Sequence, residues 1–113
     1  MQNVVDIYEG GQDIILRDAP ALIVDHCIED RPMARISCYI ALATLEFAAK
    51  GCGFGTCWAG LVIIAAMAEY RPLMEILNLP EDQKFCGAIM MGYPKLKYTR
   101  IPLRNKPIIF WHD

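Results

Sequence analysis

The segment Met33 to Lys50 restricts the fold of this chain more than any other, because it favours a helix that has almost no polar side. The segment contains neither Pro nor Gly, and its only charged residues are Arg35, Glu46 and Lys50. A helix that is apolar nearly all round belongs in a protein interior or under a partner subunit. We therefore expect a central helix over residues 33–50, with Lys50 at the negative end of its dipole and Gly51 as its C-cap.

Apolar runs separated by turn signals predict the other elements. Residues 1–18 are polar and turn-rich, with a break at Gly10-Gly11, so no regular element is expected there. The expected elements are strands over 21–24, 85–91 and 108–111, and helices over 61–70 and 72–77. This order predicts one mixed domain of helices and strands across residues 1–113, with no sign of a second domain.

The glycine-rich segment 51–60 follows the central helix and is the most informative stretch for function. Glycines at alternate positions allow unusual backbone conformations or the close approach of another group, although a helix cap and a tight turn would also explain them. A dinucleotide-binding fingerprint requires glycines after a strand, at G-x-G-x-x-G spacing, and neither condition is met. The Gly-Lys-Ser/Thr of a phosphate-binding P-loop is also absent.

The five cysteines are odd in number, and the N-terminus has neither the basic nor the apolar region of a signal peptide. We therefore expect free thiols in a reducing cytoplasm. A metal site through Cys52 and Cys57, with Cys38 or Cys86, is a minor alternative, because the tight C-x2-C pairs of zinc and iron–sulfur sites are missing. No histidine is placed to activate Cys57, so we expect no catalytic dyad. For the reason given above, we expect no metal site either.

Composition limits the partners of the chain. A net charge of −2 argues against nucleic acid, whose phosphates need a basic surface. No apolar run reaches the ~18 residues of a membrane span, so no membrane association is expected. Apolar residues including Gly make up about 58% of the chain, against ~45–50% in an average domain. A chain this small can hide that excess only in an unusually apolar core or against a partner.

Several phrases, in order along nearly the whole chain, resemble those of one protein family, the nitroreductases. They are the strand entry at 10–20, the central helix at 40–49, the glycine loop at 53–60, and the loop and tail phrases at 92–94, 100–102 and 104–107. The closest similarity is to small nitroreductase-like proteins that occur alone or fused to ferredoxin domains. The resemblance implies an α+β fold, with an antiparallel or mixed sheet packed on a buried central helix, and a homodimer with FMN at the subunit interface.

The resemblance also implies which residues hold the cofactor. The backbone of Cys57, Trp58, Ala59 and Gly60 would lie along the flavin ring, with an N–H near Ala59 or Gly60 facing the hydride-accepting nitrogen N5. A flat ring against backbone explains glycine there, since a Cβ would hold it off. Arg100 would pair with the FMN phosphate, because a guanidinium fork suits phosphate geometry. Lys97 and Arg104 are weaker candidates for the same role.

Members of this family begin with helices whose Arg/Ser-rich motif grips the FMN phosphate, and the present sequence has no equivalent. We therefore expect a fragment, a truncated product or a reduced member of the family. Two hypotheses follow. The first is an oxidoreductase that passes hydride from NAD(P)H, or electrons from a ferredoxin, through FMN to a nitroaromatic, quinone or similar small acceptor. The second is a non-catalytic dimerisation module without flavin.

Overall fold

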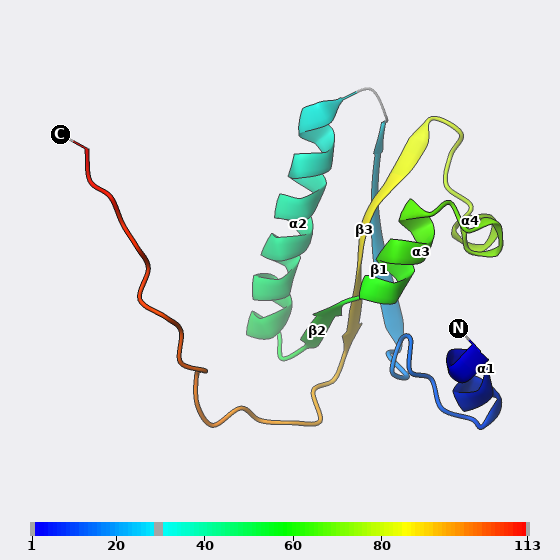
Figure 1. Cartoon of the computed structure of the whole chain (residues 1–113), viewed down its shortest axis with the longest axis horizontal. Helices are drawn as coiled ribbons and strands as arrows, with labels where there is room; N and C mark the ends of the chain where they lie inside the picture. Colours follow the sequence, from blue (N-terminus) through cyan, green and yellow to red (C-terminus); the bar gives the residue numbers. More distant parts are fainter. Residues whose placement is uncertain (1, 29–30, 113) are drawn as a thin grey trace.

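The computed structural model describes residues 2–28 and 31–112. A three-stranded sheet forms its centre, with α2 on one side and α3 on the other (Figure 1). The elements in chain order are α1 (Gln2–Glu9), β1 (Ala21–Ile28), α2 (Pro32–Gly51), β2 (Gly55–Trp58), α3 (Gly60–Met67), α4 (Arg71–Leu77) and β3 (Gln83–Gly92). The α+β class expected from the sequence is confirmed.

Strand β3 is the middle strand and pairs antiparallel with both neighbours, in the order β1-β3-β2. Every side chain from Phe85 to Met90 is buried, and Ala88 and Ile89 are completely inaccessible to solvent. A continuous apolar run of this kind suits a strand that is covered on both faces. The expected strand at 85–91 is confirmed and extends by one or two residues at each end.

Helix α2 matches the expected helix at 33–50 to within one residue at each end. Within this chain it buries one face, through Cys38, Leu42 and Ala49. Its outer face remains exposed, with Phe47 82% and Ile40 61% accessible. The expected burial all round is therefore not reached within a single chain, because the described elements cover only one side of this helix.

The C-terminal cap of α2 differs from the expected one. The helix continues through Gly51, and Gly53 is the residue with left-handed backbone, at φ +83°. The Gly53 N–H donates to the Lys50 carbonyl and the Phe54 N–H donates to the Ala49 carbonyl. This pair of bonds is the Schellman arrangement, which favours glycine at the left-handed position. Gly53 is thus explained by the cap that was assigned to Gly51.

Two expectations at the chain ends are wrong. Residues 2–9 form a helix, because Val4, Ile7 and Tyr8 repeat at helical spacing within a segment judged by its polar composition. The expected strand at 108–111 is absent: this apolar run lies in an exposed tail that leaves the sheet after β3 (Figure 1). No strand in the described part of the chain lies beside the tail, and an isolated strand has no partner for its backbone groups.

None of the helices that the structure describes has both the length and the apolar character needed to cross a membrane.

Candidate functional site

The end of β2 and the start of α3 form a tight turn that the sheet holds in place. Strand β2 pairs with β3 up to Trp58, opposite Ile89, and the Ala59 N–H continues the pairing by donating to the Ala88 carbonyl at 3.0 Å. Ala59 is only 1% exposed and belongs to the core cluster beneath α3. The chain direction at this turn is therefore fixed by burial and by backbone hydrogen bonds.

Gly60 begins α3 and faces open space. A Cβ at this residue would meet no atom of the chain within 4 Å, so nothing in the described chain requires glycine here. Helix geometry leaves the N–H groups of Gly60, Leu61 and Val62 without an intrahelical acceptor, and no side chain caps the helix within the described residues. The turn thus combines room for a close approach with free donors at the positive end of a helix dipole.

Glu46 of α2 holds β2 in place from the side of the sheet opposite α3. Its carboxylate accepts a hydrogen bond from the Trp58 indole N–H at 2.8 Å and one from the Thr56 hydroxyl at 3.2 Å. The Trp58 ring also packs against Tyr39, with the ring centroids 6.5 Å apart. The Trp58 side chain therefore serves the α2 contact, which leaves only its backbone for a ligand at the turn.

A broad, open depression of about 960 Å³ lies beside β2, and its lining includes Cys57 and Met90. Four cationic side chains also line it: Arg17, Lys50, Lys95 and Lys97. Arg17 lies in a turn whose left-handed backbone, at φ +55°, is held by the Asp13 carboxylate. That carboxylate accepts N–H bonds at 2.9 Å from Leu16 and 3.0 Å from Ile15, and the bond from Leu16 is the main reason that the pKa of Asp13 is lowered.

The structure brings together only part of the expected site. Cys57 and Lys97 line the depression, whereas Arg100 and Arg104 lie further along the exposed tail and do not. In the described part of the chain neither arginine has an ion-pair partner. Of the two candidate amides, the Ala59 N–H is used inside the sheet, which leaves the Gly60 N–H available to a ligand.

Two residues with a structural part in the site were not identified from the sequence. Glu46 was counted only as a charge interrupting an apolar helix, and its bonds to Thr56 and Trp58 join segments 10 and 12 residues apart. Arg17 stands within the phrase at 10–20 that carried the family resemblance, but no role was assigned to it. An unexplained charge in an otherwise apolar helix was the available signal for Glu46.

Comparison with known proteins identifies the family to which this chain belongs. The model of the nitroreductase family matches residues 2–93, and the chain belongs to this family. No curated protein matches the chain.

Two solved structures share the fold. The chain is 23% identical to a nitroreductase from Bacteroides fragilis with bound FMN, with a TM-score of 0.60 over 92% of this chain and 60% of that one. It is 19% identical to an oxidized iodotyrosine deiodinase bound to FMN and 3-iodo-L-tyrosine, with a TM-score of 0.66 over 99% of this chain and 57% of that one. The chain therefore spans somewhat under two thirds of the length of each.

Proposed function

We propose that this chain binds FMN against the turn between β2 and α3 and acts as an FMN-dependent oxidoreductase of the nitroreductase type. The observation that carries the proposal is Gly60, where the chain leaves space that a Cβ would fill and leaves a free N–H beside it. These features fit a flat ring lying against backbone. Both of the solved structures compared above contain bound FMN, which supports the same cofactor here.

Each proposed binding residue contributes in a different way. The Gly60 N–H would donate to the ring, while the backbone of Cys57, Trp58 and Ala59 would form the wall that leads to it. The burial of Ala59 and the hydrogen bonds of Glu46 keep this backbone wall rigid. Little conformational entropy is therefore lost in this segment when FMN binds. When bound, FMN supplies the hydride chemistry, and the protein contributes binding and orientation.

Cations at the depression beside β2 would neutralise the phosphate of the cofactor. Lys97 already lies at the depression, together with Arg17, which extends the set expected from the sequence. Arg100 and Arg104 would join them once the tail packs against a surface, because both lie in exposed extended chain. The proposed electron donor is NAD(P)H or a ferredoxin, and the proposed acceptor is a nitroaromatic, a quinone or a similar small molecule.

A second copy of the chain is proposed to cover the outer face of α2 and the tail. The radius of gyration is 17.3 Å, against about 13 Å for a compact domain of this length, and the tail extends away from the sheet (Figure 1). The tail exposes at least four fifths of the area of Ile108, Phe110 and Trp111, which is a large apolar surface to leave in water. A homodimer would bury both surfaces.

The same exposure favours a second candidate function, a dimerisation module that binds no flavin. Titration of the purified chain with FMN, followed by quenching of flavin fluorescence and by the visible spectrum, separates the two candidates. The oxidoreductase predicts saturable binding and oxidation of a reduced nicotinamide, or of reduced ferredoxin, that depends on FMN. A dimer that takes up no FMN contradicts the first candidate and supports the second.

Substitution of Gly60 tests the proposed ring contact. We expect Gly60→Val to weaken FMN binding by about tenfold or more, because roughly 1.4 kcal/mol of lost contact corresponds to a tenfold change. Gly51→Val is the matched control, since a Cβ at Gly51 also meets no atom within 4 Å and its backbone is helical. Equal FMN affinities for the two variants would contradict the placement of the ring at Gly60.

A further inference from the structure

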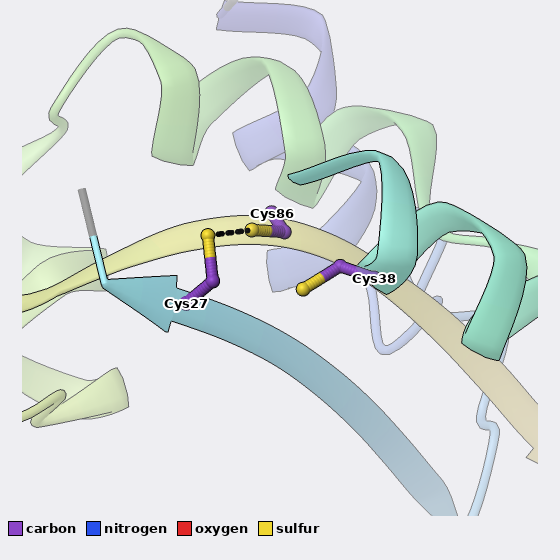
Figure 2. A group of neighbouring side chains, drawn as sticks. All are labelled: Cys27, Cys38 and Cys86. Atoms are coloured by element: carbon purple, nitrogen blue, oxygen red, sulfur yellow. Dashed lines mark hydrogen bonds between the residues drawn. The ribbon is translucent and has the colours of Figure 1, made fainter. Parts of the chain in front are cut away.

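Three cysteines far apart in the sequence meet between the sheet and α2. Cys27 lies near the end of β1, Cys38 lies in α2, and Cys86 lies in β3 (Figure 2). Their sulfur atoms all lie within 4.8 Å of one another. The Cys86 thiol donates to the Cys27 sulfur at 3.1 Å, and the Cys38 thiol donates to the His26 carbonyl at 3.7 Å.

An irregularity in strand pairing creates this cluster. In the register of β1 with β3, Asp25 pairs with Gly87 but His26 pairs with Phe85, so that Cys86 has no residue directly opposite. A bulge of this type redirects the side chain of the extra residue, and such bulges are retained features of sheets rather than defects. Here it places the Cys86 sulfur beside Cys27 and toward Cys38 on the α2 side.

Two of the three thiols lie in an environment that disfavours their charged, thiolate forms. Cys38 and Cys86 are buried, whereas Cys27 is partly exposed. Burial is the largest cause of the raised pKa of both buried thiols; the Asp25 carboxylate adds to the shift at Cys38, and the Arg35 guanidinium opposes it at Cys86. Cys38 and Cys86 are therefore neutral thiols when no cation is present, and a bound metal ion would favour their thiolate forms.

The sulfur positions suit a single ion with three sulfur ligands. Metal–sulfur bonds of about 2.3 Å in a trigonal arrangement place sulfur atoms about 4 Å apart. The separations in the cluster, from 3.1 Å to no more than 4.8 Å, bracket that value, so rotamer adjustments of under 1 Å per sulfur would form the site. Thiolate ligands select soft ions over Mg²⁺ and Ca²⁺.

We propose that Cys27, Cys38 and Cys86 form a three-thiolate site for one soft d10 cation, Cu(I) or Zn(II). On binding, three S–H bonds break, three metal–sulfur bonds form and three protons pass to solvent, with no transfer of electrons. The site is separate from the proposed flavin turn. The minor metal alternative considered from the sequence used Cys52 and Cys57, with Cys38 or Cys86 as a further ligand. Cys52 and Cys57 are exposed and lie outside the cluster, and Cys27 was not considered.

The experiment uses the fully reduced chain under anaerobic conditions and Cd²⁺ as the first probe. We expect a thiolate-to-metal absorption band that saturates at one ion per chain, with release of three protons measured by a pH indicator in weak buffer. Cys27→Ser should reduce proton release to two and weaken binding by about a hundredfold or more. A control variant with both Cys52→Ser and Cys57→Ser should bind as the wild type does.

Cys38→Ser and Cys86→Ser should weaken Cd²⁺ binding as Cys27→Ser does, provided that these variants fold. If they do not fold, Cys27→Ser alone tests the site, because Cys27 is only partly buried and its substitution disturbs the core less. Competition of Cu(I) and Zn²⁺ against chelators then identifies the preferred ion. Absence of a saturable band, undiminished binding by Cys27→Ser, or loss of binding in the Cys52/Cys57 control would overturn the proposal. Formation of a Cys27–Cys86 disulfide with no metal uptake after reduction would also overturn it.

Discussion

The hydrogen bond from Trp58 to Glu46 should contribute measurably to stability, because it ties the edge strand β2 to α2. We consider Trp58→Phe, which keeps an aromatic ring and removes the N–H that donates to the carboxylate at 2.8 Å. A hydrogen bond to a charged group contributes about 1.5–3 kcal/mol, and we take the lower end because Glu46 is only partly buried. The expected loss in free energy of unfolding is therefore about 1.5 kcal/mol.

That loss converts into a melting temperature that can be measured. An entropy of unfolding of about 2.1 cal/mol/K per residue gives roughly 0.24 kcal/mol/K for the whole chain, so Tm should fall by about 6 °C. Thermal unfolding followed by circular dichroism at one fixed protein concentration provides the measurement, since self-association makes Tm depend on concentration. Tyr8→Phe is the control, because Tyr8 lies in α1, outside the proposed dimer surfaces, and is 66% exposed. Its substitution should change Tm by no more than about 2 °C.

A double-mutant cycle with Glu46→Leu, which removes both acceptor oxygens, separates the hydrogen bond from the smaller ring of phenylalanine. We expect the two single changes to be non-additive by about 1 kcal/mol, because residues in direct contact couple by roughly 0.5–3 kcal/mol. The reasoning is refuted if the effects of Trp58→Phe and Glu46→Leu simply add, or if Trp58→Phe destabilises the chain no more than Tyr8→Phe does.

Two further substitutions test the packing of the sheet and its entry turn. Gly87→Ala should lower the free energy of unfolding by about 1–3 kcal/mol, because the new Cβ would lie 2.7 Å from the Leu42 Cδ1 atom. Thermal or urea unfolding measures this, and an unchanged midpoint would show that α2 moves aside without cost. Asp13→Asn should lower Tm near pH 7, and the gap to wild type should close as pH falls below about 3.8. The pKa of Asp13 is lowered in the folded chain, so its contribution is present above the unfolded value and is lost on acidification; a gap that is equal at about pH 7 and about pH 3 would contradict this.

The elements that could be predicted from the sequence are those whose signal is local. Helix α2 has no breaker inside it, and β3 is an unbroken apolar run, so the structure places both near their expected bounds. Strand β2 was missed because its four residues adjoin glycines that indicate a turn, and it becomes a strand only through pairing with β3. The strand expected at 108–111 had the right composition but has no neighbouring strand among residues 2–28 and 31–112, and composition alone cannot supply a hydrogen-bonding partner.

The candidate site could be predicted only in part for the same reason. Gly60 was identified because its segment resembles a family phrase, and the structure adds that no contact with the described residues explains this glycine. The part played by Glu46 depends on the packing of α2 against β2, which no spacing in the sequence reveals. The three-cysteine cluster is the extreme case, since positions 27, 38 and 86 show no metal-binding pattern and meet only through a bulge in β3.

Strand β3 supports both proposed sites, yet the two can be tested independently. The Ala88 carbonyl holds the flavin turn, and Ala88 belongs to the core cluster on the α3 side. Cys86, two residues earlier, turns toward Cys38 on the α2 side because of the bulge. Substitutions more than about 7–10 Å apart with no shared partners are usually additive, so Cys27→Ser should leave FMN affinity unchanged and Gly60→Val should leave Cd²⁺ binding unchanged. If either change affects both ligands, β3 couples the two sites, and each result then has to be interpreted with the other ligand present.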